Sequence, residues 1–193
     1  MMLQLLKTYF GYDSFRPLQQ DIIQHILQRK DALVLMPTGG GKSICYQLPA
    51  LMLDGTAVVV SPLISLMKDQ VESLQANGIE ARAMNSANSD TENLILRREC
   101  QQGKVKLLYI SPERLLQEMN LLLKDMKVSL FAIDEAHCIS QWGHDFRPEY
   151  TQLQTIRQQF PQVPIVALTA TADKITRQDI VQQQDLKDPR IFI

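Results

Sequence analysis

The sequence has little of several features that mark specialised classes of protein. It holds three cysteines, Cys45, Cys100 and Cys138, which are too far apart for a C-x-x-C zinc pattern and do not form a disulfide framework. This usage of cysteine favours a protein from the reducing interior of a cell. No apolar run approaches the length of a membrane span, and residues 1–10 lack the layout of a signal peptide. We therefore expect a cytoplasmic protein with no zinc site and no membrane partner.

An excess of positive charge is also missing. The net charge is −1 and the pI is about 6.3, so the bulk charge does not show the basic footprint of a typical nucleic-acid binder. The composition, 45% hydrophobic and 21% charged, is that of an ordinary globular domain. With 193 residues the chain is long enough for one domain and hardly for two.

Short apolar runs alternate with helix-like segments along the chain. The expected strands are Ala32–Leu35, Ala57–Val60, Ala81–Met84, Lys106–Ile110, Leu130–Ile133, Ile165–Leu168 and Ile191–Ile193. The expected helices are residues 2–9, Leu18–Leu27, Ile44–Leu53, Leu63–Ala76, Asp90–Gln102, Glu149–Phe160 and Lys174–Gln184. Continuously apolar strands are typical of a parallel sheet covered on both faces. The pattern predicts an α/β domain with a doubly wound, mostly parallel sheet of about seven strands, with ligands beyond the carboxyl ends of the strands.

The stretch from Met36 to Ser43, which reads MPTGGGKS, has the layout of a phosphate-binding loop between a strand and a helix. Its glycines let backbone N–H groups approach an anion, and the helix N-terminus adds partial positive charge. Lys42 could reach the terminal phosphates of a nucleotide, and the Ser43 hydroxyl could bind Mg²⁺. Since Met36 stands where the full pattern has glycine, a glycine-rich turn with an exposed lysine is the alternative. The expected nucleotide-binding residues here are Thr38, Gly39, Gly40, Gly41, Lys42 and Ser43.

A second strand ends in two acids, Asp134 and Glu135. In a protein with a phosphate-binding loop this is the Walker-B arrangement, in which Asp134 would hold Mg²⁺ and Glu135 would orient or deprotonate the attacking water. The alternative is an acidic cap on the following helix. His137 could bridge the nucleotide site to the next motif or merely pack there. The hydroxyls of ALTATA, residues 167–172, could couple the phosphates to a second ligand or simply form a polar strand end.

Residues 9–20 contain Tyr12, Arg16 and Gln19 around a proline that suits a first helical turn. The amide of Gln19 could bind an adenine through two hydrogen bonds, as Gln does on DNA, and Tyr12 or Arg16 could stack on the base. From spacing alone, a helix start with an aromatic packing cluster is favoured over adenine recognition.

The chain directly after the two acids concentrates aromatic and basic residues. Trp142, His144, Phe146 and Arg147 could form a platform on which the bases of a single strand stack; the alternative is a hydrophobic plug that buries Trp142 and Phe146. Two strands also end in Ser-Pro, at Ser61 and Ser111. Each serine could cap a helix whose N-terminus meets a nucleic-acid phosphate, or each Ser-Pro could be an economical turn.

Together, FGYDSFRPLQ, MPTGGGKS, SPLISLMKDQ, YISPERL, DEAHCISQWGHDFRPEY and ALTATA resemble the first RecA-like motor lobe of the RecQ family of superfamily 2 DNA helicases. The resemblance covers about residues 5–193. DEAH and TGGGKS are shared widely among helicases and indicate only the superfamily. The run ISQWGHDFRPEY is far more specific and is similar to the aromatic-rich loop of the family.

The resemblance implies a RecA-like domain over residues 1–193, in which residues 1–30 are a helical segment that binds adenine. It implies ATP and Mg²⁺ as ligands, with Gln19 recognising adenine and Arg16 and Tyr12 lining the nucleotide. It implies single-stranded and duplex DNA as partners, sensed by Trp142 and its neighbours in the loop. Family members translocate 3′ to 5′ and unwind DNA in repair and recombination, so association with the nucleoid is expected in a bacterium.

The family continues into a second RecA-like lobe that carries an arginine finger, and in many members into zinc-binding and winged-helix modules. None of these is expected within the 193 residues. An arginine finger is typically worth about 10³–10⁵ in rate, so the chain alone is expected to bind ATP weakly, hydrolyse it very slowly and unwind nothing. Two other functions stay open. A nucleotide-dependent binding module would not need Glu135, and a DEAH-type RNA helicase would leave the loop Trp142–Arg147 unexplained.

Overall fold

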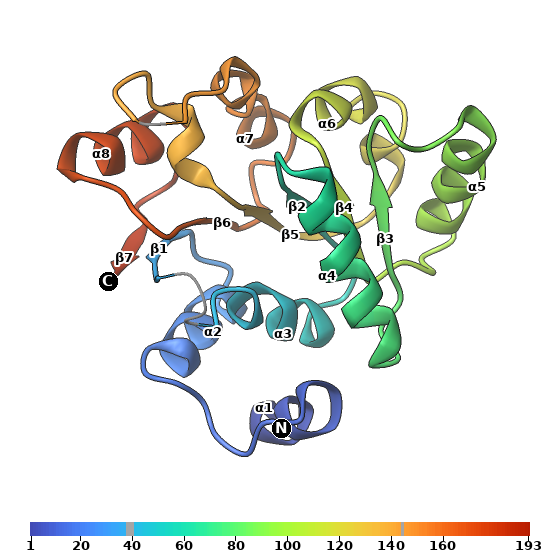
Figure 1. Cartoon of the computed structure of the whole chain (residues 1–193), viewed down its shortest axis with the longest axis horizontal. Coiled ribbons are helices and arrows are strands. Elements are labelled where there is room, and N and C mark those ends of the chain that lie inside the picture. The colour runs from blue at the N-terminus through green and yellow to red at the C-terminus, as the bar shows by residue number, and fades with distance from the viewer. Residues whose placement is uncertain (38–40, 144) are drawn as a thin grey trace.

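The computed structural model describes residues 1–37, 41–143 and 145–193. Within this part of the chain, seven strands form one sheet in the order β3-β4-β2-β5-β6-β1-β7, and every neighbouring pair is parallel (Figure 1). The strands are β1 (Ala32–Leu35), β2 (Thr56–Val60), β3 (Ala81–Met84), β4 (Leu107–Ile110), β5 (Val128–Ile133), β6 (Ile165–Thr169) and β7 (Arg190–Phe192). The predicted doubly wound parallel sheet is therefore confirmed.

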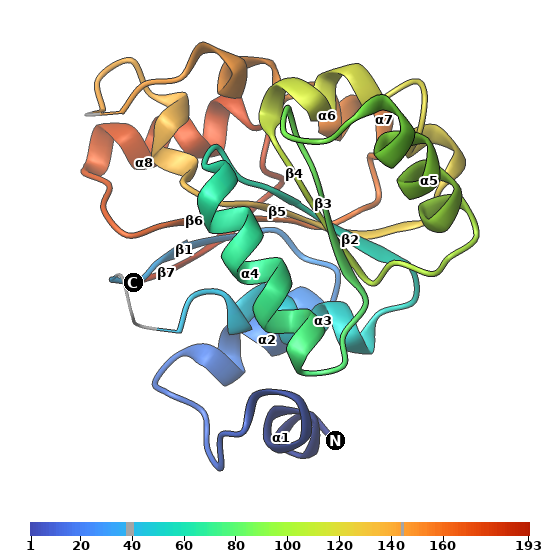
Figure 2. The ribbon, with the colours of Figure 1, turned by 45° about the vertical axis from the view of Figure 1, so that its right-hand side comes forward.

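Helices cover both faces of this sheet, as Figures 1 and 2 show from two directions. One face carries α2 (Gln19–Leu27), α3 (Ile44–Met52) and α4 (Ile64–Ala76). The other carries α5 (Asp90–Gln101), α6 (Pro112–Glu118), α7 (Thr155–Gln159) and α8 (Lys174–Gln183). Successive residues of a strand face opposite ways, so in β1 Ala32 and Val34 pack toward α2 and α3 while Leu33 packs toward the other layer. Burial on both faces explains why the strands are apolar throughout.

The N-terminal segment adds an outer layer on the α2 side (Figure 2). The helix predicted over residues 2–9 is α1 (Met2–Leu5), continued as a π-helix (η1, Leu6–Phe10) that ends at Gly11 with a φ of 75°. Leu6 is fully buried and packs in one cluster with residues of α2 and α3. This packing fixes the start of the segment that leads to Tyr12 and Gln19.

The single helix predicted over Glu149–Phe160 is wrong. The structure has a 3-10 helix (η4, Pro148–Gln152) followed by the short α7. Two threonine hydroxyls bond back to carbonyls three residues earlier, Thr151 to Pro148 and Thr155 to Gln152. Such bonds compete with the regular helical ladder and favour tighter turns.

The two Ser-Pro strand ends behave differently. Ser111 stands at the N-cap position of α6 and Pro112 is its first helical residue, as the motif predicts, but the Ser111 hydroxyl makes no capping bond within the described chain. No helix over residues 112–118 was among the predicted elements. After Ser61 the chain bends at Pro62, Leu63 is extended and stands at the N-cap position, and α4 begins at Ile64. The prediction that Ser61 caps a helix is therefore wrong.

Asp31 ties together the amino end of the sheet. Its carboxylate pairs with Arg157, which comes from α7, and accepts backbone N–H groups from Ile165 at 2.9 Å and Lys187 at 2.6 Å. The side chain is 4% exposed. One buried carboxylate thus joins the starts of β1 and β6, α7 and the turn before β7.

The remaining short elements are the 3-10 helices η2 (Leu123–Asp125) and η3 (Ala136–Ile139). Within the described ranges, the helices are all too short or too polar to cross a bilayer.

Candidate functional site

A cleft of about 600 Å³ lies beyond the carboxyl ends of β1 and β5, at the edge of the sheet where ligands were expected. The strand order brings β1 and β5 to either side of β6, so two motifs that lie far apart in the sequence meet there. The predicted residues that line the cleft are Tyr12, Arg16, Gln19, Gly41, Lys42, Ser43, Asp134 and Glu135. Thr38, Gly39 and Gly40 lie outside the described residues.

Gln19 joins the N-terminal segment to the phosphate-binding loop. It is 2% exposed; its Oε1 accepts the backbone N–H of Arg16 at 2.8 Å, and its Nε2 donates to the carbonyl of Gly41 at 3.1 Å. A side-chain amide has two donors and two acceptor positions, so one of each is left for a ligand. The packing role and the adenine-binding role predicted for Gln19 are therefore compatible.

Gly41 of the phosphate-binding loop has a backbone conformation that favours glycine. Its φ of 83° is in the left-handed region, and a Cβ built on it would lie 2.2 Å from Gln19 Nε2. We predict that Gly41→Ala pushes Gln19 out of place and weakens nucleotide binding by about tenfold or more, since backbone strain and a lost hydrogen bond together cost a few kcal/mol. Gly103→Ala is a matched control, because Gly103 also has a positive φ but an open environment. Titration with a fluorescent ATP analogue checks this; equal affinities for the two variants would contradict it.

The two acids sit in different electrostatic surroundings. Burial raises the pKa of the Asp134 carboxyl, the positive charge of Lys42 acts against that rise, and the negative charge of Glu135 adds to it. Asp134 Oδ1 also accepts the backbone N–H of Glu135 at 3.0 Å. A buried carboxylate with a raised pKa gains from a nearby cation. The cleft therefore favours a positively charged ligand beside Asp134.

Glu135 has a φ of 52°, an uncommon conformation for a residue other than glycine. It stands at the N-cap position of η3, but its side chain makes no capping bond within the described chain. The alternative that the acids only cap a helix is thus not supported. Instead, Glu135 Oε2 lies 3.5 Å from His137 Nε2. Strained backbone of this kind persists where the surrounding structure holds it, commonly at functional sites.

His137 bridges the cleft and the end of β6. Its Nδ1 lies 2.7 Å from Thr169 Oγ1, and the Thr169 hydroxyl donates to the carbonyl of Thr171 at 3.0 Å. Because that hydroxyl uses its own proton on Thr171, it accepts the bond from His137. The contacts Glu135–His137–Thr169 link the acids to ALTATA, whereas the sequence suggested a bridge from His137 to the loop that follows it.

Sequence reasoning missed five residues that line the cleft, Ser14, Ile44, Tyr46, Leu66 and Gln70. Beneath it lies a polar network. The hydroxyls of Tyr46 and Tyr109 are 2.8 Å apart, and Gln47 Nε2 donates to the Tyr109 hydroxyl at 2.9 Å and to Gln70 Oε1 at 2.8 Å. Burial raises the pKa of both tyrosine hydroxyls, so they stay protonated. Leu66 and Gln70 lie in the quoted run SPLISLMKDQ and Ser14 lies in FGYDSFRPLQ, which were the available signals. Ile44 and Tyr46 lie in a helix that carries no motif.

We call residues 140–147 the aromatic loop; His144 within it lies outside the described residues. Trp142 is 77% exposed and Phe146 is 36% exposed. The alternative that the loop is a plug burying these two rings is therefore wrong. The Arg147 backbone N–H donates to the carbonyl of Cys138 at 2.8 Å, while its guanidinium lies 3.7 Å from Asp145. The loop thus presents its aromatic rings outward beside a cation.

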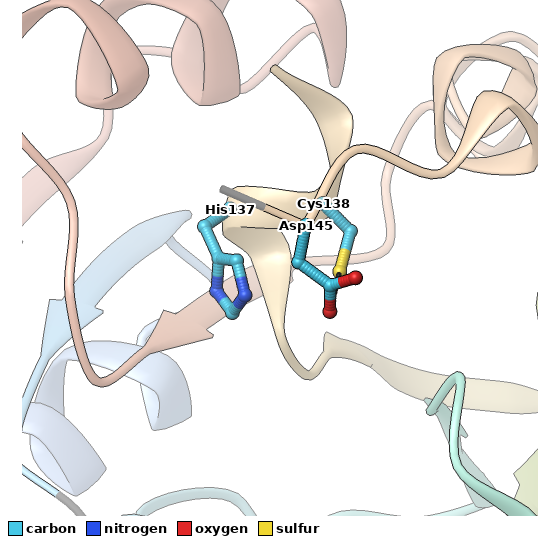
Figure 3. A group of neighbouring side chains, drawn as sticks. All are labelled: His137, Cys138 and Asp145. Atoms are coloured by element: carbon cyan, nitrogen blue, oxygen red, sulfur yellow. Dashed lines mark hydrogen bonds between the residues drawn. The ribbon is translucent and has the colours of Figure 1, made fainter. Parts of the chain in front are cut away.

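His137, Cys138 and Asp145 form a cluster at the base of this loop (Figure 3), with one potential ligand atom of each within 4.8 Å of the others. The Cys138 thiol donates to Asp145 Oδ2 at 3.7 Å, and burial raises its pKa to about 12. The hydrogen bond from the thiol ties Asp145 to η3, and we therefore interpret the cluster as support for the loop.

Ser61 and Ser111 are 3% and 2% exposed, and their backbone N–H groups bond across the sheet to Ile110 and Met84. Their hydroxyls therefore do not lie open on the surface of this structure. A contact from either serine to DNA stays a prediction.

Comparison with known proteins places the chain in a family. The model of the DEAD/DEAH box helicase family matches residues 16–180. The chain belongs to the DEAD/DEAH box helicase family. This DEAD/DEAH box chain is also 54% identical over 192 residues to the ATP-dependent DNA helicase RecQ of Pasteurella multocida. The matched region is 99% of the chain and 30% of that relative. The RecQ protein of Bacillus subtilis is 50% identical over 182 residues, 93% of the chain and 31% of the relative.

The resemblance of the DEAD/DEAH box chain to RecQ helicases is thus confirmed, and the chain spans about a third of the length of these relatives. The solved structure of a hypothetical ATP-dependent RNA helicase from Sulfolobus tokodaii superposes on this protein with a TM-score of 0.74 at 19% identity. The superposition covers 98% of this protein and 56% of the Sulfolobus chain. This likeness supports the RecA-like fold alone.

Proposed function

We propose that the chain is the ATP-binding motor lobe of a RecQ-like DNA helicase, which couples ATP hydrolysis to 3′-to-5′ translocation on single-stranded DNA and to duplex unwinding. The observation that carries the proposal is the cleft in which Gln19, Lys42 and the acids Asp134 and Glu135 converge. Its contacts lead through His137 to Thr169 at the end of β6, and His137 lines a small pocket together with Trp142 of the aromatic loop. A DNA substrate would place the protein at the nucleoid in a bacterial cell, with roles in repair and recombination.

The nucleotide would lie across the cleft with its base toward the N-terminal segment, residues 1–30. Gln19 has one donor and one acceptor position left for adenine, and Tyr12 is half exposed at the mouth of the cleft, where it could stack on the base. Arg16 lines the same wall. Lys42 would neutralise the terminal phosphates at the N-terminus of α3.

The donors on the floor of the cleft fit Mg²⁺, which prefers oxygen ligands and binds through one or two protein groups together with the phosphates. Asp134 and the Ser43 hydroxyl would hold it, and the ion would neutralise charge on the phosphates. Glu135, at the edge of the cleft, would orient or deprotonate the attacking water. Its carboxylate lies 3.5 Å from His137, which in turn contacts Thr169, so the water-orienting group is linked to the end of β6.

Single-stranded DNA would meet the aromatic loop. Exposed Trp142 and Phe146 offer ring faces for stacking, which is worth about 1–3 kcal/mol per base and is tolerant of sequence. Arg147 would contact a phosphate or a base. This arrangement favours DNA translocation over a nucleotide-binding module that lacks a second ligand.

The test uses a two-lobe protein that contains this segment. Trp142→Ala is expected to lower the stimulation of ATP hydrolysis by single-stranded DNA about tenfold while the rate without DNA stays unchanged, because the ring contacts DNA and not the nucleotide. Leu94→Ala is a matched control, since Leu94 is 51% exposed on α5, away from the cleft. Full stimulation of the Trp142→Ala variant, or stimulation by single-stranded RNA in place of DNA, would reject the proposed role.

A further inference from the structure

A buried contact fastens the aromatic loop to a helix that lies outside it. Ser140 Oγ donates to Asp179 Oδ2 of α8 at 2.7 Å, and Ser140 is fully buried. The same oxygen accepts the backbone N–H of Trp142 at 3.2 Å. A hydroxyl has one proton and two acceptor positions, so donation to Asp179 and acceptance from Trp142 occur together and strengthen each other.

This contact acts on the backbone of Trp142, because the ring itself is largely in solvent. A ring that is 77% exposed receives little direction from packing, so the direction it takes depends on how its backbone is held. At the far end of the loop, Arg147 and Asp145 bond to Cys138, which is part of η3. Asp179 therefore supplies an anchor from a different element at the end where Trp142 lies.

Helix α8 also begins at the nucleotide side of the molecule. It follows β6 through Thr169, whose hydroxyl meets His137, and it starts at Asp173, whose carboxylate accepts the Thr176 N–H at 2.8 Å. Asp173 and Thr176 line a pocket of about 230 Å³ together with Trp142. Helix α8 thus lies between the strand end that contacts His137 and the loop that carries Trp142.

We propose that Asp179 is a positioning residue that sets the direction in which Trp142 is presented to single-stranded DNA. The proposal deepens the DNA-binding role of the loop and rests on it. Asp179 touches neither nucleotide nor DNA; it acts through the Ser140 hydroxyl. Hydrogen bonds to a carboxylate are stronger than those between neutral groups, which suits the contact that holds the Trp142 end of the exposed loop.

The chain offers a direct probe, since Trp142 is its only tryptophan. Fluorescence anisotropy of the 193-residue chain therefore reports the motion of the loop without a label. We compare Asp179→Ala and Ser140→Ala with Gln182→Ala, an exposed position on the same helix. The first two variants are expected to lower the anisotropy and to weaken binding of oligothymidine about tenfold, the effect of losing a hydrogen bond to a charged group. Gln182→Ala should match the wild type.

Two further variants distinguish a loss of loop positioning from a general loss of stability. Asp179→Asn keeps an acceptor oxygen and is expected to restore most of the anisotropy and affinity. The double variant Ser140→Ala/Asp179→Ala is expected to be no worse than Ser140→Ala alone, because Asp179 acts only through the hydroxyl that Ser140→Ala already removes. If Asp179→Ala does not fold, the other two variants still test the proposal. Ser140→Ala removes the other partner of the bond, and Asp179→Asn is the conservative change.

Unchanged anisotropy and unchanged DNA affinity in Ser140→Ala and Asp179→Ala, at wild-type melting temperature, would overturn the positioning role. Additive losses in the double variant would overturn it as well. Failure of the wild-type chain to bind oligothymidine would instead count against the proposed function of the loop, while the anisotropy in the absence of DNA would still decide whether Asp179 holds Trp142.

Discussion

Replacing Lys42 by alanine is expected to weaken the binding of ATP to the chain about 100-fold, since a charge-assisted hydrogen bond to a phosphate is worth roughly 1.5–3 kcal/mol. Lys42 lines the cleft just before α3 and lies close enough to Asp134 for its charge to stabilise that carboxylate. The variant therefore loses a phosphate contact and also leaves Asp134 more easily protonated. Calorimetric titration of the 193-residue chain with MgATP measures the change.

Lys30→Ala is the matched control for Lys42→Ala. Lys30 is exposed just before β1, at the opposite end of that strand from the cleft, so its removal changes the net charge equally without touching the site. If the two alanine variants bound ATP equally, Lys42 would not be the phosphate-binding residue.

Asp31→Ala is expected to destabilise the domain by about 3–5 kcal/mol, because it leaves the Arg157 guanidinium without its carboxylate in a poorly hydrated place. It also removes the acceptor for the N–H groups of Ile165 and Lys187. At roughly 2–4 °C per kcal/mol for a domain of this size, the melting temperature should fall by about 10 °C or more. Differential scanning calorimetry measures it.

The exposed Asp13 provides the control for Asp31, since Asp13→Ala removes the same charge from the surface. A double variant that lacks both Asp31 and Arg157 should be less destabilised than the sum of the two single variants, because they share one ion pair. A melting temperature of Asp31→Ala equal to that of Asp13→Ala would show that the buried pair adds nothing to stability.

The sequence predicts the sheet well because its strands are buried on both faces. A strand such as β2, Thr56–Val60, is apolar enough to be recognised without any partner in view. The break between η4 and α7 was not predictable in the same way. Tyr150 in η4 donates its hydroxyl to the carbonyl of Asp134 at 2.7 Å, a contact between segments that local periodicity does not report.

The residues of the candidate site were likewise predictable only in part. Motifs with fixed spacing, MPTGGGKS and DEAH, indicate which residues belong to the cleft, and strand order then brings them together. Tyr46 was missed because residues 44–50 of α3 are all buried, so nothing in the sequence separates a lining residue from a packing residue there. Gln70 was missed because its run SPLISLMKDQ indicates the family without giving each residue a role. The exposure of Trp142 could not be predicted either, since an aromatic-rich loop is compatible with both a buried plug and an open platform.

Glu135→Gln distinguishes a cleft that hydrolyses ATP from one that only holds the nucleotide. The change removes the charge that would activate water and leaves the size of the side chain and the phosphate contacts of Lys42 in place. In a two-lobe protein with single-stranded DNA, we predict ATP binding within about twofold of the wild type and turnover lower by about 10²-fold or more, the usual loss when a general base is removed. Equal rates of ATP hydrolysis for Glu135→Gln and the wild type would contradict the account and identify the chain as a nucleotide-binding module.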